Sequence, residues 1–174
     1  MSTLYVDTLS PNTASRVLSA GHVVQVVQGV KTSTSTITST TFSDIGLSAS
    51  ITPTSSSSKI LVSVQLWGYS GFYTAPNRLM RNSTEIGAAP TASNRPTTAL
   101  PFSLPPSSDG AISVSAVTIL DSPSTTSSVT YKVQSAKRAD GTESSYINRS
   151  ETDRDTTSYD PRTVSYITLM EIAQ

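Results

Sequence analysis

The chain has 174 residues, with 12 basic and 12 acidic side chains and a formal net charge of zero. Because nucleic acids and anionic membranes attract proteins with a basic excess, this balance argues against both as partners. The absence of cysteine excludes disulfides and thiolate metal sites, and the length allows one domain with a core of its own.

The first stretch of the chain, "MSTLYVDTLSPNTASRV", has no basic region followed by an apolar core. It therefore does not have the pattern of a secretory signal peptide. No apolar run along the chain approaches the roughly 20 residues that a membrane-spanning helix needs. We expect a protein that is made in soluble form inside a cell.

Hydroxyl residues dominate one early segment, where the run from Thr32 to Thr41 consists of serine and threonine apart from Ile37. Threonine is β-branched and fits the pleated surface of a strand. Alternation places Thr32, Thr34, Thr36 and Thr38 on one face and Ile37 on the other. This pattern is typical of a polar strand at a sheet edge or between subunits, where threonines pair across strands.

Alternation of apolar and polar residues is the main signal in the rest of the chain, and it predicts strands over 59–69, 111–121, 128–136 and 163–172. Segment 22–30 is more continuously apolar, which predicts a strand covered on both faces. Segment 78–87 reads as a hairpin that turns at Asn82 and Ser83. The proline-rich segment 87–109 reads as a loop.

Turn signals separate these short strands at intervals of about 8–12 residues, which is typical of antiparallel sandwiches and barrels. We therefore predict an all-β, antiparallel β-sandwich over residues 22–174. Residues 1–21 are predicted to form an extended N-terminal arm, within which 12–21 could make one short helical turn.

Catalytic chemistry finds little support in the sequence. His22 is the one histidine, and no nucleophile elbow, phosphate-binding loop, dinucleotide fingerprint or metal-ligand spacing accompanies it. The motifs Asn82-Ser-Thr and Asn148-Arg-Ser are glycosylation sequons, but no secretory signal accompanies them. We predict that the chain is not an enzyme and takes no cofactor and no metal.

An acidic segment, "SETDRDTTSYD", spans residues 150–160 and contains Glu151, Asp153, Asp155 and Asp160. Its carboxylates could supply oxygen ligands to a calcium ion. The arginines interspersed with them favour a loop held by salt bridges instead. Both readings stay open at this point.

Aromatic side chains gather in "LWGYSGFY", which contains Trp67, Tyr69, Phe72 and Tyr73. Such rings can stack on sugars or anchor an interface. They can also close one end of a sandwich. We take these four residues as candidate contacts for a host receptor or glycan.

The stretch "TFSDIGLSASITPTSSSSKILVSVQ" resembles a recurrent β-domain of bacteriophage virion proteins, especially those of marine cyanophages. The family-like blocks in this chain are Thr41–Val64, Arg78–Ile86, Asp121–Gln134 and Tyr146–Ile172. The opening "STLYVDTLSP" is similar to the start of many phage tail-fibre chains. The likeness covers most of the chain apart from the proline-rich segment, and its blocks carry no catalytic residues.

The resemblance implies a phage structural protein, made in the host cytoplasm and located in the virion. The leading hypothesis is a homotrimeric, jelly-roll-like sandwich that serves as a short tail fibre or receptor-binding appendage, since 174 residues are too few for a shaft as well as a tip. The alternative is a capsid decoration protein that stabilises the head. A third reading, a glycan depolymerase, has Glu143, Glu151 and Asp153 as its loose candidates for paired carboxylates.

The expected partners are further copies of the chain, other virion proteins of the tail or capsid, and a host surface glycan or receptor. Neither nucleic acid binding nor membrane insertion is expected. The attachment arm Ser2–Ser10, with Leu4, Tyr5 and Val6, would dock as an added strand on a neighbouring virion protein. The four aromatic residues and the loop 87–109 would face the host.

Overall fold

The computed structural model describes residues 19–70, 73–91, 93–94, 97–104, 110–139 and 142–174. None of these residues lies in a helix, and twelve strands run through them. The strands are β1 (Val23–Lys31), β2 (Ser35–Ile37), β3 (Ser43–Ile51), β4 (Lys59–Ser70), β5 (Tyr73–Ala75), β6 (Asn77–Arg81), β7 (Thr84–Ile86), β8 (Phe102–Leu104), β9 (Ser113–Asp121), β10 (Val129–Ser135), β11 (Ser145–Ile147) and β12 (Ser165–Ile172).

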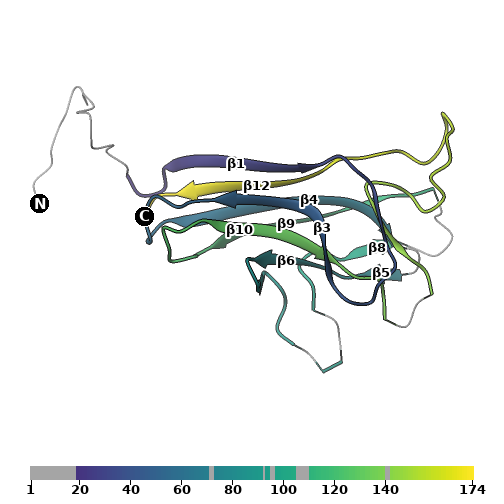
Figure 1. Cartoon of the computed structure of the whole chain (residues 1–174), viewed down its shortest axis with the longest axis horizontal. Helices are drawn as coiled ribbons and strands as arrows, with labels where there is room; N and C mark the ends of the chain where they lie inside the picture. Colours follow the sequence, from purple (N-terminus) through teal and green to yellow (C-terminus); the bar gives the residue numbers. More distant parts are fainter. Residues whose placement is uncertain (1–18, 71–72, 92, 95–96, 105–109, 140–141) are drawn as a thin grey trace, which may run out of the picture.

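Two antiparallel sheets make the body of the molecule, and one of them curls into a half-barrel. In the first sheet the strand order is β1-β12-β4-β11-β2, and β9 pairs with the other side of β4. The second sheet has the order β3-β10-β6-β7, and β5 and β8 form a separate ribbon. Figure 1 shows β1 and β12 in one layer and β10 and β6 in the layer below. The predicted all-β, antiparallel fold is confirmed.

The core lies between the two sheets and is built by alternation. On β4 the side chains of Ile60, Val62, Val64 and Leu66 are all buried, as the sequence predicts. The second sheet contributes inward residues from β3 and β10, among them Val129, Tyr131 and Val133. Burial of these apolar faces against each other is the main stabilising contribution to the fold.

The edges of the two sheets meet closely along one side, where β1 passes β3. A Cβ atom at Gly29 would overlap the backbone carbonyl of Ser48, so the two strands approach more closely than any side chain at position 29 would allow. On the other side, Asp121 of β9 accepts hydrogen bonds from Arg81 (2.8 Å) and from the Tyr131 hydroxyl (2.7 Å). Polar contacts therefore link the sheets where the backbones do not touch.

The prediction for segment 22–30 is wrong in one respect. It forms β1, but β1 is an edge strand, and Val23, Val26 and Val30 are between 49% and 56% exposed. A continuous apolar run indicates burial on both faces only if something covers the second face. In the residues described, nothing packs over the outer side of these valines.

The hydroxyl-rich run contributes a shorter strand than its length suggests. Only β2, residues 35–37, pairs, and it forms the edge of the first sheet next to β11. Ile37 is buried at 7% exposure, so the predicted edge position and facing are both confirmed. The predicted hairpin is also confirmed as β6 and β7, with Asn82 in the left-handed conformation (φ 51°) that a tight turn requires.

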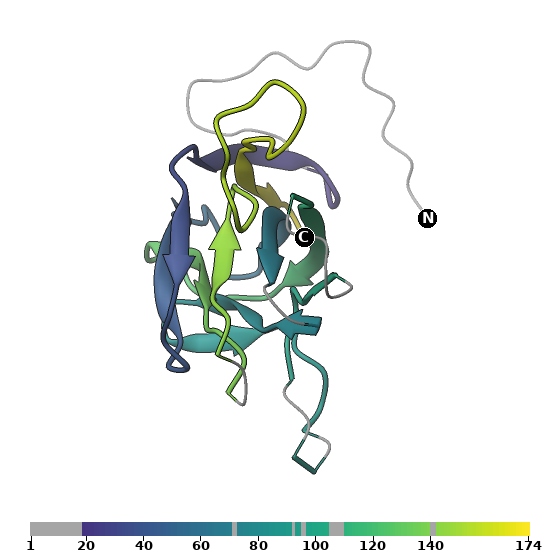
Figure 2. The same cartoon turned by 90° about the vertical axis from the view of Figure 1, so that its right-hand side faces the viewer.

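The proline-rich segment is a loop for most of its described length, but it contains β8, which pairs with β5. Figure 2 shows the loop after β7 projecting from the body on the side opposite the loop of residues 148–163. The C-terminal Ala173 is tied to the start of β1 through backbone hydrogen bonds with Gly21 (2.8 Å) and His22 (2.9 Å). Most of the predicted arm, residues 1–18, lies outside the described residues.

Candidate functional site

Of the four predicted contact residues, the structure describes the side chains of Trp67 and Tyr69, and these two do not share a surface. Trp67 is half-buried and lies opposite Val114, on the outer side of the first sheet. Tyr73 begins β5, and its side chain lies outside the described part of the structure, as does all of Phe72. The predicted arm residues Leu4, Tyr5 and Val6 also lie outside it.

Tyr69 cannot serve as a surface contact, because its side chain is 2% exposed. The last residues of β4 are buried on both faces where β11 pairs with them, so alternation no longer brings one side chain in two to solvent. The Tyr69 ring lies 6.2 Å from that of Tyr146, its partner across the strands. Its role is to fill the interior, and the expectation from sequence is corrected.

The acidic loop is held by arginines. Asp160 has a fully buried side chain that accepts hydrogen bonds from Thr152 (2.8 Å) and from the Arg154 Nε (2.6 Å). These bonds, with that of Arg154 first, lower the pKa of Asp160. Among the described residues, no group of three or more histidine, aspartate or glutamate side chains is placed to hold a metal ion.

Asp153, one of the loose candidates for a glycan-cleaving acid, is paired from two sides. Arg162 reaches its two oxygens at 2.6 and 2.7 Å, and Arg149 lies 3.2 Å away. Both oxygens of this carboxylate are occupied by guanidinium groups. The loop therefore reads as a structural, salt-bridged unit.

The sequons and the histidine carry no sign of a chemical role. Asn148 is fully buried, and its amide donates to the carbonyls of Lys31 (2.7 Å) and Ser33 (3.1 Å), so it cannot carry a glycan in the folded protein. Asn82 lies in the hairpin turn and accepts a hydrogen bond from the backbone N–H of Thr130, which ties the turn to β10. His22 is exposed at the entry to β1.

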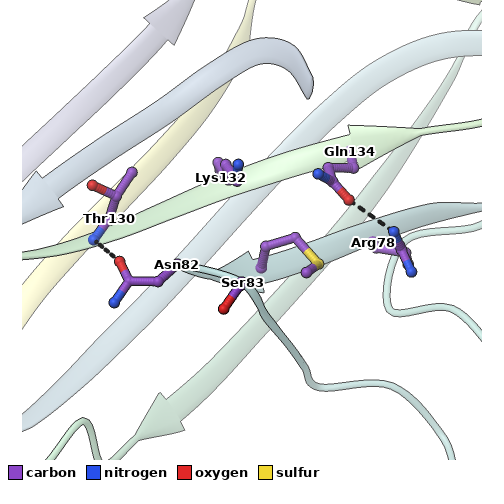
Figure 3. A pocket seen from close by; sticks show the side chains of 7 residues that line it. Arg78, Asn82, Ser83, Thr130, Lys132 and Gln134 are labelled. Carbon is purple, nitrogen blue, oxygen red and sulfur yellow. Dashed lines mark hydrogen bonds between the residues drawn. The ribbon is translucent and has the colours of Figure 1, made fainter. Parts of the chain in front are cut away.

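The outer face of the second sheet is polar and hollowed. A cavity of about 620 Å³ lies over β6 and β10, lined by Arg78, Met80, Asn82, Ser83, Thr130, Lys132 and Gln134. Figure 3 shows the labelled side chains standing on one face of the two strands. Lys132 is engaged by Asp44 of β3 at 2.8 Å, and this bond lowers the pKa of that carboxyl group.

A larger cavity, of about 950 Å³, begins beyond Arg78. Its walls come from the segment before β3, from β5 and the start of β6, from β7 and the loop after it, and from the segment after β10. Among the described residues of its lining, the cationic side chains are Arg78, Lys137 and Arg138, and Glu85 is the carboxylate. Hydroxyl and amide groups come from Thr40, Thr74, Ser93, Asn94, Thr97 and Thr98.

Arg78 joins the two cavities and is held from several directions. Its guanidinium lies over the ring of Phe42, 3.8 Å from the centroid. Its Nη2 donates to Gln134 at 2.8 Å, and its Nη1 lies 3.6 Å from Glu85. Stacking and hydrogen bonding together orient the guanidinium before any ligand arrives.

The outer face of the first sheet has the opposite character. Strand register aligns Val26, Met170, Leu61 and Leu120 across β1, β12, β4 and β9, and we call these residues the apolar row. The next row is polar and consists of Gln28, Thr168, Ser63 and Thr118. It is linked within the sheet by Gln28 to Thr168 (3.0 Å) and Ser63 to Thr118 (3.1 Å).

No protein-family model and no curated protein matches the chain. Within the described residues, no helix is long and apolar enough to cross a membrane. The sequence analysis did not predict the larger cavity. Two of its predicted features contribute to the cavity lining: the arginine of the predicted hairpin and the predicted loop 87–109. The positions of Phe42 and Lys137 in the lining could not be predicted. No local sequence pattern identifies residues that come together only through the strand pairing of the second sheet.

Proposed function

We propose that the chain is a non-enzymatic structural protein of a bacteriophage virion, in the class of short tail fibres and receptor-binding appendages. In this proposal it is a homotrimer of jelly-roll-like sandwiches displayed on the particle surface. The motif resemblance points to the virion, and the all-β architecture is compatible with that assignment.

The observation that carries the proposal is the apolar row. Val26 at its β1 end is 56% exposed and Leu120 at its β9 end is 53% exposed. The side chains of this row and of the polar row beside it carry no charge at neutral pH. A continuous, uncharged, partly apolar face is the composition of a surface that is covered in an assembly.

The size of this face suits a subunit contact. A patch four strands wide and nine residues long measures roughly 19 by 30 Å, from strand spacing and rise. Counted on two partners, that footprint is about 1,100 Å², just under the lower bound of about 1,200 Å² for specific interfaces. Three copies that direct this face toward a common axis would enclose the apolar rows of all three.

The arm supplies the link to the particle in this proposal. In this proposal Leu4, Tyr5 and Val6 would form an added strand that pairs with a sheet edge of a neighbouring virion protein. Deletion of Ser2–Ser10 is expected to abolish incorporation into particles. Normal incorporation of the shortened chain would show that the arm assignment is wrong.

Copy number tests the function and separates it from the runner-up. Quantitative mass spectrometry of purified virions is expected to give tens of copies per particle, as a tail appendage requires. Hundreds of copies would instead assign the chain to head decoration. Absence of the chain from purified particles would overturn the proposal. A depolymerase would release sugar from host surface glycan, and no release is expected.

A further inference from the structure

We infer that the outer edge of β9 pairs with the outer edge of β1 in a second copy of the chain, as antiparallel neighbours. The inference deepens the proposed trimer, on which it rests, because it names the strands through which the copies join. Both strands border the outer face that carries the apolar row, one on each side. Edge pairing would add backbone hydrogen bonds to a face whose footprint alone is just under that of specific interfaces.

Both edges have a free side. In the described part of the chain, the backbone of β9 pairs with β4 alone, and the backbone of residues 26–30 in β1 pairs with β12 alone. Val27 of β1 and Val117 and Ile119 of β9 pack against the core but are only half-buried, whereas the core-facing residues of β4 are fully buried. Solvent therefore reaches both edges, and a further strand could cover each of them.

The other sheet edges carry the features that keep exposed strands from pairing, which are short length, charge and irregular register. The edge strands β2 and β7 have three residues each. The edge strand β3 carries Asp44 and, within a register shift against β10, Gly46 with a φ of 81°. By contrast, residues 26–30 of β1 and 113–120 of β9 contain no charge, no proline and no register shift. Long, regular, uncharged edges of this kind are suited to strand pairing with another chain.

Strand direction makes β1 and β9 suitable partners under rotational symmetry. Each neighbouring pair in the order β1, β12, β4 and β9 is antiparallel, so β9 runs opposite to β1. Rotation about an axis parallel to the strands preserves their directions, so β9 of one copy meets β1 of the next as an antiparallel neighbour. A contact between two different edges can close into a ring of three copies, whereas pairing of β9 with itself would stop at a dimer.

The rows of the outer face set the expected register between the copies. The apolar row crosses the sheet at one level, so rotation about that axis places Leu120 of one copy level with Val26 of the next. Two residues further along each strand, Thr118 then lies opposite Gln28, and both side chains are exposed. This register joins the apolar rows of three copies into one continuous ring, and it joins the polar rows in the same way.

Disulfide trapping in the full chain tests the contact, since the protein contains no cysteine of its own. Directly opposite residues of paired strands lie within the Cα separation that a disulfide spans. After mild oxidation, Gln28→Cys/Thr118→Cys is expected to give covalent trimers, because each copy links to two neighbours. The two single variants should stay unlinked, and their co-expression should give covalent dimers only. The control Val26→Cys/Val114→Cys carries thiols on the same strands at different levels and should give at least tenfold fewer covalent trimers.

Covalent dimers of Thr118→Cys alone would indicate twofold pairing of β9 and would overturn the inference. Circular dichroism checks the fold of each variant, and Val30→Cys/Ala116→Cys tests the same register one row away if the first pair is unstable. Failure of both pairs to link in a protein that sediments as a trimer would also overturn the inference, while the trimer itself would stand. Covalent trimers of a chain that is absent from purified virions would keep the contact and remove the proposed function.

Discussion

Arg78 illustrates how much one residue can organise on a polar sheet face. Its guanidinium stacks on Phe42, bonds to Gln134 and approaches Glu85, and it forms part of both cavities on the outer side of the second sheet. The contacts come from strands and segments far apart in sequence. No pattern around position 78 predicts them, which is why a reading of local motifs found the hairpin and missed the cavity.

Asp160 gives a prediction at the same scale, about acid stability. Its pKa in the folded protein lies below the ordinary value of 3.8, because Arg154 and Ser150 hydrogen-bond to the charged carboxylate. A lowered pKa means that the stabilisation is fully present above the unfolded pKa and is lost as the pH falls through the folded one. The melting temperature of the wild type should therefore fall on acidification below about pH 4.

The variant Asp160→Asn is expected to melt lower than the wild type at pH 7 and to lose less on acidification. Glu151→Gln is a matched control in the same loop, for which no side-chain contact of the carboxylate is seen in the described residues, and it should melt like the wild type. Differential scanning fluorimetry between pH 7 and pH 3 measures both. Equal pH dependence of Asp160→Asn and the wild type would contradict the structural role given to this carboxylate.

Elements are the scale at which sequence reasoning succeeded best and also failed most clearly. Alternation predicted β4 and β10 and the residues that each buries, because a core-facing strand must place apolar side chains on one face. In the predicted strand 111–121 alternation puts Val114 and Ala116 on one face, but both are exposed on β9. Periodicity shows which residues share a face, and only the packing of a second layer decides which face is covered.

The crossing of β1 and β3 gives a prediction at the scale of elements. Gly29→Ala would force the new methyl group against the carbonyl of Ser48, and β1 would have to move outward. Overpacking of this kind costs about 1–3 kcal/mol in free energy of unfolding. The control Ala116→Val adds bulk on the exposed face of the edge strand β9 and should change stability by less than about 0.5 kcal/mol.

Urea unfolding followed by tryptophan fluorescence measures this difference, since Trp67 lies on β4 within the first sheet. A Gly29→Ala variant as stable as the wild type would mean that β1 and β3 are not in the close contact described. A glycine inside a strand permits the close approach of another backbone. Sequence alone does not show which strand approaches, because β1 and β3 belong to different sheets.

At the scale of the whole molecule, the outer face of one sheet carries the apolar row and that of the other is polar, which suggests that the two faces have different functions. The face with the apolar row would meet other copies, and the outer face of the second sheet, with the cavity beside Arg78, would stay exposed. This arrangement matches a displayed module that assembles through one sheet and recognises through the other.

Self-association gives the prediction at this scale. The double variant Val26→Lys/Leu120→Lys places charges at both ends of the apolar row and is expected to weaken trimer formation at least tenfold, because like charges would face each other across the interface. The control Ser56→Lys/Thr126→Lys adds the same charge in exposed turns and should remain trimeric. Sedimentation equilibrium measures both, and a wild type that is monomeric at all concentrations would contradict the trimer.

A three-dimensional map of the intact virion at moderate resolution tests the central claim most directly. The proposal predicts density for three copies of the chain around a threefold axis on the particle surface. In that density the strands β1, β12, β4 and β9 should face the axis, and the cavity beside Phe42 and Arg78 should face outward. A virion without this density, or with single copies whose apolar row faces solvent, would contradict the account.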